Sequence, residues 1–295
     1  MGDFDDLLSN TPDEPKQSAE LTKEEYAAKK KNEREEAFAL SDQTAMEVSA
    51  NGSLFQSFLD LQGRLDRYSA VNALLIFAKN QNASRVGSFD YWKNQACSVR
   101  PGQMAISILE PHEYTKEDGT PGTGYNVKKV FDISQVDTRK LKSVPASHYT
   151  ERQLLAALIS KAPAKIIGVD ELPGDLGAMT DPDTGDISVR RGMKFDDTFR
   201  CVAQELATAD LTTGSDSQAD PAFSSYCASY LLCKKYGVDV QSFSFENAPG
   251  VFDGMDALEV KGELLQIRDV AENISGRMAR QLEVQSKAAK NQEAR

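Results

Sequence analysis

The sequence predicts an α+β protein, in which a small domain of helices packed on an antiparallel sheet precedes a mostly helical C-terminal domain. Two alternating apolar stretches, at 104–109 and 126–133, predict paired strands. Apolar residues at helical spacing recur both before and after these strands. A chain of 295 residues with 40% hydrophobic content can bury two modest cores. The two domains are therefore expected at 46–145 and 150–290, joined by a short polar connector.

The first 45 residues are expected to form an acidic tail without stable structure, or an arm that depends on a partner, although residues 23–39 could form a solvated, charged helix without an apolar stripe. Residues 1–50 carry 13 Asp and Glu against 6 Lys and Arg, and they contain few aromatic residues. Such a composition buries too little apolar surface to offset the entropy lost on ordering. The net charge of the whole chain is −11, and only residues 51–145 are net basic, with 12 Lys and Arg against 9 Asp and Glu. A polyanionic partner is therefore expected to bind that part.

Helices are expected to open the first domain. Apolar residues at helical spacing run over 54–65, and a second apolar face runs over 71–77, with a break near Tyr68. The two strands come later and are separated by a glycine-rich loop at 119–124.

The second domain is expected to begin with a helix at Thr150, because Thr150 and Gln153 have the spacing of a capping box. A short strand at 165–169 follows, and two further strands flank a turn at 181–185, which predicts a hairpin. Helices are then expected at 199–206 and 222–236, and an apolar stripe over 255–287 predicts one or two long amphipathic helices.

The helix expected at 199–206 leads into a sequence that nearly matches the zinc-peptidase motif HExxH. The five residues here are Gln204-Glu205-Leu206-Ala207-Thr208. In that motif two histidines one turn apart bind Zn²⁺ and the glutamate activates the metal-bound water. The spacing and the glutamate are present, but both imidazoles are missing. A hairpin directly before such a helix is the order of compact zincin-like domains, so a zincin-like fold is expected. Gln204, Glu205 and Thr208 would then be vestigial.

Several ordered motifs between residues 55 and 137 carry a family resemblance. They are Tyr68-Ser69-x-x-Asn72-x-Leu74-Leu75-Ile76, Trp92, Val99-Arg100-x-Gly102, Ile106-x-Ile108-Leu109-x-Pro111 and Val130 to Gln135. This succession resembles the N-terminal single-stranded-DNA-binding domain of ArdC-type antirestriction proteins and their LtrC-like relatives. The stretch 177–206 resembles the metallopeptidase half of the same proteins, in the same order.

The resemblance implies a domain that binds single-stranded DNA joined to a former metallopeptidase. The family's third zinc ligand is a glutamate on the helix at 222–236, where this chain has Ser224 and Tyr226. An amide and hydroxyls are poor zinc donors compared with imidazole, thiolate or carboxylate. Because all three ligands are missing together, we expect no metal, no cofactor and no catalytic residue, and interpret this half as a pseudo-enzyme.

The candidate DNA-binding residues are basic and aromatic side chains of the first domain, with one asparagine of the resemblance motif. Single strands are held in basic grooves by aromatic rings on which bases stack, at about 1–3 kcal/mol per base. The alternative is that the aromatic residues belong to the core and the cations are ordinary surface. Pro101 and Gln103 stand where the relatives place lysines, which would weaken binding. The candidates are Arg64, Arg67, Tyr68, Asn72, Lys79, Arg85, Trp92, Lys93, Arg100, Lys128 and Lys129.

Three function classes follow. The first is a non-catalytic accessory protein of a mobile element or phage, which binds single-stranded DNA and, through the pseudo-peptidase half, an unidentified protein partner. The second is an antagonist or assembly factor that binds only proteins, which the acidic net charge favours. The third is an active metallopeptidase. A hard cation held by Glu205, Asp210, Asp216 and Asp220 is a further alternative for the second half.

The sequence contains neither an N-terminal signal pattern nor an apolar run of membrane-spanning length. Its four cysteines form no C-x-x-C pair, so reduced thiols are expected. We therefore expect a cytoplasmic protein without a membrane partner.

Overall fold

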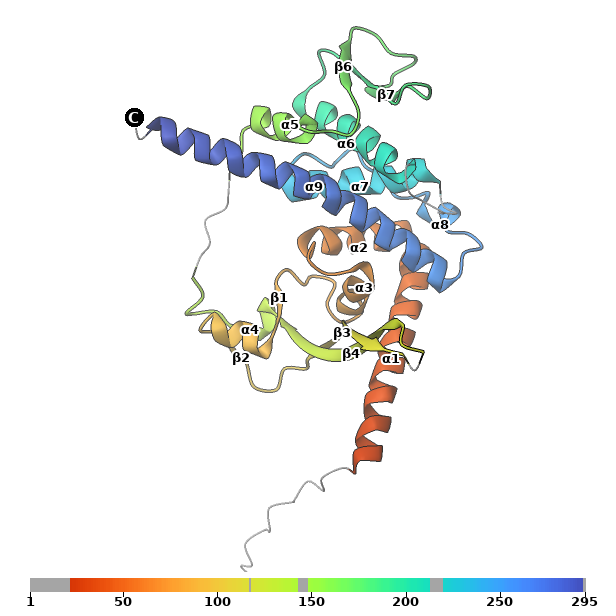
Figure 1. The fold of residues 1–295 in the computed structure, drawn as a ribbon, viewed down its shortest axis with the longest axis vertical. Coiled ribbons are helices and arrows are strands. Elements are labelled where there is room, and N and C mark those ends of the chain that lie inside the picture. The colour runs from red at the N-terminus through yellow and green to blue at the C-terminus, as the bar shows by residue number, and fades with distance from the viewer. Residues whose placement is uncertain (1–21, 117, 143–147, 213–219, 294–295) are drawn as a thin grey trace, which may run out of the picture.

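The computed structural model describes residues 22–116, 118–142, 148–212 and 220–293. Helix α9 (Ala257–Glu293) runs across the molecule in Figure 1, above the N-terminal helices and sheet. It contacts α5 (Glu151–Ile159) and α7 (Pro221–Tyr236) of the C-terminal half as well as α1 (Lys23–Ser49) and α3 (Ala70–Lys79) of the N-terminal half. The arrangement confirms the predicted α+β class.

The expected tail is wrong for residues 23–45, which belong to helix α1 (Lys23–Ser49). Thr22 caps this helix in a capping box with Glu25. The first half is exposed, but Ala37 and Ala45 are buried, and the helix contacts α3 of the N-terminal half and α9 of the C-terminal half. Small side chains let the helix approach its neighbours closely, so it packs without the apolar stripe that a sequence pattern requires. The first 21 residues of the expected tail lie outside the described part of the chain.

The predicted helix pair and strand pair of the N-terminal half are confirmed. The break near Tyr68 separates α2 (Gly52–Arg64) from α3 (Ala70–Lys79). Strands β3 (Ile106–Thr115) and β4 (Pro121–Asp132) form an antiparallel hairpin that is longer than expected, since β4 takes in much of the glycine-rich stretch. The smaller elements are β1 (Val86–Ser88), which completes the sheet in the order β1-β4-β3, α4 (Phe89–Asn94), the paired strands β2 (Ser98–Val99) and β5 (Val136–Asp137), and the 3-10 helix η1 (Ile133–Gln135).

The C-terminal half also follows the prediction. The capping box of Thr150 and Gln153 opens α5 (Glu151–Ile159), and the expected hairpin is present as an antiparallel strand pair. The long stripe forms one helix, α9, and not two. The other elements are β6 (Ile166–Val169), β7 (Ala178–Thr180), β8 (Ile187–Arg190), α6 (Phe195–Thr212), α7 (Pro221–Tyr236) and α8 (Ala248–Val251), with sheet order β6-β8-β7.

The main hydrophobic core runs through both halves. The ring of Phe55 on α2 lies 5.6 Å from that of Phe223, 5.7 Å from that of Phe245 and 5.4 Å from that of Phe252, measured between ring centres. These residues are buried in one cluster with the apolar faces of α3, α6, α7 and α9. Residues 145–150 therefore divide the sequence into two halves, but the two halves share one hydrophobic core.

None of the helices in the described ranges is both long and apolar enough to cross a membrane. All four cysteines are free thiols.

Candidate nucleic-acid interface

A groove with a volume of about 1010 Å³ lies in the N-terminal half, between the α2–α3 turn, the β1–α4 region and the β3–β4 hairpin. It brings together residues that are far apart in the sequence. Six of the predicted DNA-binding residues line it: Arg64, Arg67, Tyr68, Asn72, Arg85 and Lys128.

The turn between α2 and α3, residues Leu65–Ser69, carries two of these side chains into the groove. The Tyr68 amide donates to the Leu65 carbonyl at 2.9 Å, and Ser69 caps α3. Arg67 is exposed, whereas Tyr68 is half-buried and its hydroxyl donates to the Val86 carbonyl at 2.9 Å. Burial raises the pKa of the Tyr68 phenol. The turn thus presents one free cation and one anchored ring.

Asn72 lines the groove, but its side-chain amide holds two elements of the fold together. Its amide nitrogen donates to the Leu109 carbonyl at 2.8 Å, and its amide oxygen accepts from the Leu109 amide at 2.8 Å. The two bonds attach α3 to the middle of β3, where the strand leaves the core.

Arg64 also bonds to the backbone. Its guanidinium donates to the carbonyls of Ala83 at 3.0 Å and Gln81 at 2.9 Å, which fixes the loop after α3. Carbonyls do not neutralise the charge, so Arg64 still contributes a positive field at the groove.

Arg85 is held between a ring and a loop. Its Nε donates to the Tyr91 hydroxyl at 2.9 Å, and its guanidinium lies 5.6 Å from the Tyr91 ring centre, a cation–π distance. The loop that carries it is fixed by buried Asp132, whose carboxylate accepts from the amides of Ser84 and Arg85. Burial acts to raise the pKa of Asp132, but these bonds and those from Ser134 outweigh it and hold the pKa below its usual value.

Trp92 is corrected from a candidate stacking surface to a core residue. It is fully buried, packs with Cys97 and Val136, and donates from its indole nitrogen to the Phe131 carbonyl at 3.0 Å. No face of the ring is open to a base. The sequence had left this alternative open, because a short helix gives no periodicity that separates a buried from an exposed aromatic residue.

The remaining candidates are scattered. Lys128 lines the groove but is paired with Glu110, and Lys129 donates to the Ser107 hydroxyl at 2.7 Å outside the groove. Arg100 donates to the Ser134 carbonyl, and Lys79, Lys93 and Arg100 are exposed residues that do not line the groove.

Three aromatic residues of the groove were missed by the sequence analysis as binding candidates: Phe38, Tyr91 and Tyr125. Tyr125 is 37% exposed and lies edge-on to Phe38, with 5.6 Å between ring centres. Phe38 falls on helix α1, where a disordered tail was expected, and only the hairpin brings Tyr125 beside it. The sequence signal that could have identified Tyr125 is its position shortly before Lys128 and Lys129 in the same stretch.

The charges of the groove favour an anion. Four cations line it against two carboxylates, Asp66 and Glu110. Glu110 is paired with Lys128, and Asp66 with Lys235 outside the groove. Within the described ranges no carboxylate lies within ion-pair distance of Arg64, Arg67 or Arg85, so the charges of these three are not neutralised by an ion pair, although Arg64 and Arg85 are hydrogen-bonded.

The residues of the degenerate HExxH motif sit on α6, as predicted, in one turn of helix. The Glu205 carboxylate accepts from the Thr180 amide at 3.0 Å and from the Thr180 hydroxyl at 2.6 Å, which ties α6 to strand β7. The Thr208 hydroxyl donates to the Gln204 carbonyl at 3.1 Å. Both bonds of the Glu205 carboxylate thus lead to Thr180 in the strand pair that precedes α6.

The side chains at the expected ligand positions do not fit a zinc ion. Ser224 is buried, with its hydroxyl 3.4 Å from the Glu263 carboxylate, and the Tyr226 hydroxyl accepts from the Ser244 amide at 2.8 Å. These neutral oxygens are weak zinc donors, and each is already engaged. No group of three His, Cys, Asp or Glu residues able to hold a metal occurs in the described parts of the chain. Asp216, one of the carboxylates considered for a hard cation, lies outside them.

Residues 43–147 match the family model for the N-terminal domain of anti-restriction factor ArdC. Two crystal structures of the antirestriction ArdC protein from plasmid R388 are similar. The metal-free form is 17% identical, with 72% of this chain and 86% of that chain covered and a TM-score of 0.49, and the Mn(II)-bound form is 16% identical, with 72% and 85% covered and the same score. No curated protein matches the chain.

The family match extends the stretch for which the sequence motifs predicted this resemblance by about ten residues at each end. It includes the α2–α3 turn, β1, and both strands of the hairpin, and so most of the segments that line the groove. Residues 43–147 are therefore similar to the N-terminal domain of anti-restriction factor ArdC.

Proposed function

We propose that the chain binds single-stranded DNA in the groove of its N-terminal half, and that its C-terminal half acts without catalysis, as a support and a protein-binding surface. One observation carries the proposal: the groove gathers cations and tyrosines from four separate segments of the chain. This combination suits a single strand, because phosphates meet the cations while unstacked bases meet the rings. An accessory role in antirestriction on a mobile element or phage agrees with the ArdC-like N-terminal domain.

Tyr91 and Tyr125 are the rings we assign to base stacking, in place of Trp92. Both line the groove; Tyr125 is 37% exposed, and Tyr91, whose hydroxyl accepts from Arg85, is half-buried. Each stacked base would contribute about 1–3 kcal/mol. Tyr68 is anchored through its hydroxyl and would present only part of its ring.

The electrostatic contribution is modest. Three arginines without a carboxylate partner would neutralise about three phosphates, so log K should fall against log salt with a slope of about −2 for a single strand. The acidic body of the protein adds a long-range repulsion, and binding should therefore be weak at physiological salt.

The direct test is fluorescence anisotropy with a labelled single-stranded oligonucleotide at two salt concentrations, with a duplex of the same length as competitor. The variant Arg67→Gln with Arg85→Gln should weaken binding and flatten the salt slope by about 1.4. Lys79→Gln with Lys93→Gln is the matched control, because it removes the same charge outside the groove. Equal weakening by both pairs, or no binding of the wild type at tens of micromolar, would reject the groove.

The proposal for the C-terminal half rests on its donor set. Glu205 is held by Thr180, and the three positions that would bind zinc carry an amide and hydroxyls. Metal analysis of protein purified without chelator tests it, and stoichiometric zinc would contradict it. A protein retained in a pull-down from a host lysate after nuclease treatment would support the partner-binding role.

A further inference from the structure

We propose that helices α7 and α9 position the α2–α3 turn, so that the affinity of the groove for single-stranded DNA is set in part by Lys235 and Arg268 of the C-terminal half. The inference rests on the function proposed for the groove. It identifies two positioning residues that do not themselves line it.

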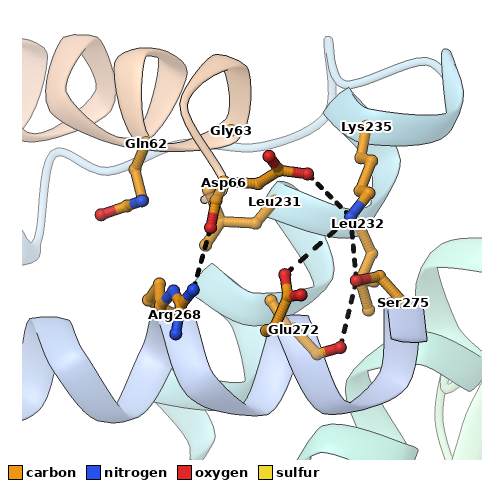
Figure 2. A pocket seen from close by; sticks show the side chains of 10 residues that line it. Gln62, Gly63, Asp66, Leu231, Leu232, Lys235, Arg268, Glu272 and Ser275 are labelled. Atoms are coloured by element: carbon orange, nitrogen blue, oxygen red, sulfur yellow. Dashed lines mark hydrogen bonds and ion pairs between the residues drawn. The ribbon is translucent and has the colours of Figure 1, made fainter. Parts of the chain in front are cut away.

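The first contact is made to the side chain of the turn. Lys235 on α7 places its ammonium 2.9 Å from the Asp66 carboxylate (Figure 2). The same ammonium donates to the Ser275 hydroxyl at 3.0 Å and lies 4.0 Å from the Glu272 carboxylate, both on α9. Lys235 is thus oriented by α9 before it meets Asp66.

The second contact is made to the backbone of the turn. Arg268 on α9 donates to the Asp66 carbonyl at 3.0 Å. Asp66 is therefore held at its carboxylate and at its carbonyl by two different helices, as Figure 2 shows. The next two residues, Arg67 and Tyr68, enter the groove.

A buried glutamine holds the turn from the N-terminal side. Gln62 is 2% exposed, and its amide nitrogen donates to the carbonyls of Leu65 at 3.4 Å and Tyr68 at 3.2 Å. Its amide oxygen and the Nε of Arg268 are buried without a hydrogen-bond partner among the described residues. Both side chains line a cavity of about 20 Å³. That volume accommodates one water molecule, which would accept from Arg268 and donate to Gln62 and so join the two supports.

Asp66 lines both this small cavity and the groove, so the turn forms the wall between them. If the contacts from α7 and α9 are removed, the turn loses its support on one side. Binding of single-stranded DNA must then also offset the entropy lost when Arg67 and Tyr68 become ordered, so the affinity falls.

Two neighbouring lysines on α7 provide a matched test. Lys234 and Lys235 are 34% and 30% exposed, and both pair with an aspartate of the N-terminal half. Lys234 pairs with Asp60, which also accepts from the Tyr230 hydroxyl, and it does not touch the turn. Lys235→Gln and Lys234→Gln therefore change charge and burial equally, but only the first releases Asp66.

Two readouts on the full chain decide the matter: oligonucleotide affinity by anisotropy, and hydrogen exchange of the Tyr68 amide, which is bonded within the turn. Lys235→Gln should bind about tenfold more weakly, comparable to the loss of one base stack, and its Tyr68 amide should exchange faster at unchanged Tm. Lys234→Gln should stay within about twofold of the wild type in both. Equal effects of the two variants, or none from Lys235→Gln, would overturn the proposal. Should Lys235→Gln fail to fold, Asp66→Asn is expected to give the same result.

The two proposals fail in different ways. If the wild type binds no oligonucleotide, the DNA-binding function is rejected, and the exchange of the Tyr68 amide still decides whether α7 and α9 hold the turn. If the wild type binds but the exchange rate is the same in both variants, the positioning role alone is rejected.

Discussion

At the scale of single residues, two side chains that were predicted to bind DNA instead hold the fold together. Asn72 belongs to a motif of the DNA-binding family, yet both ends of its amide are bonded to the Leu109 backbone. Trp92 has the character of a stacking residue but closes a small core. The sequence identifies the residue types correctly, whereas their use depends on which backbone atoms the fold brings within reach.

The two hydrogen bonds between Asn72 and the Leu109 backbone predict an effect on stability. Asn72→Ala leaves the Leu109 amide and carbonyl without partners and should lower the free energy of unfolding by about 1–3 kcal/mol. Asn126→Ala, on an exposed position of β4, is the control and should stay within about 0.5 kcal/mol. Urea denaturation measures both, and equal values would show that the Asn72 bonds add nothing.

Asp132 predicts a dependence of stability on pH. Its pKa is lower in the folded protein than in the unfolded chain, so its contribution is complete above the unfolded value of about 3.9 and is lost as the pH falls through the folded value. Asp132→Asn should therefore destabilise at pH 7 and reduce the loss of stability between about pH 4 and lower values. Urea titrations of both proteins across that range test the sign, and parallel curves would contradict it.

At the scale of elements, periodicity and capping located most helices and strands. The break before Ser69, the capping box at Thr150 and the hairpin before α6 are all local signals. The packing of helix α1 was not predicted, because its buried face is made of small residues such as Ala37 and Ala45, which give no apolar stripe. Burial of such a face depends on a neighbour and not on the sequence of the helix.

The close packing of α1 can be tested by one side chain. Ala45 is fully buried, so Ala45→Leu should overpack the contact and cost about 1–3 kcal/mol. Ala39→Leu, on an exposed position of the same helix, should be nearly neutral. Thermal unfolding of the two variants measures the difference. A neutral Ala45→Leu would mean that α1 does not pack as described.

At the scale of the whole molecule, the two halves share a core around Phe55 and its aromatic neighbours Phe223, Phe245 and Phe252. A shared core couples unfolding, so calorimetry should record one cooperative transition, and Phe55→Ala should lower its stability by about 3–5 kcal/mol without splitting it. Two separate transitions in the wild type would show that the halves unfold independently.

The candidate site could be predicted only in part. Arg64, Arg67, Tyr68, Asn72, Arg85 and Lys128 were found from residue type and motif, and they do line one groove. Tyr125 and Phe38 were missed, because the hairpin and a helix distant in sequence place them side by side. Lys79, Lys93, Arg100 and Lys129 were included because charge alone does not reveal which surface a residue faces.

By itself, the sequence determined the α+β class, the order of the main elements, the resemblance to ArdC N-terminal domains, and the absence of histidines at the two HExxH positions on α6. These features are local: they depend on residue type, spacing and motif order. The tertiary structure decided that α1 is folded, that the halves share a core, that Trp92 is buried, and that Glu205 is bonded to Thr180. It also decided that Lys235 and Arg268 support the turn beside the groove. Each of these depends on contacts between residues far apart in the chain, which only the folded arrangement specifies.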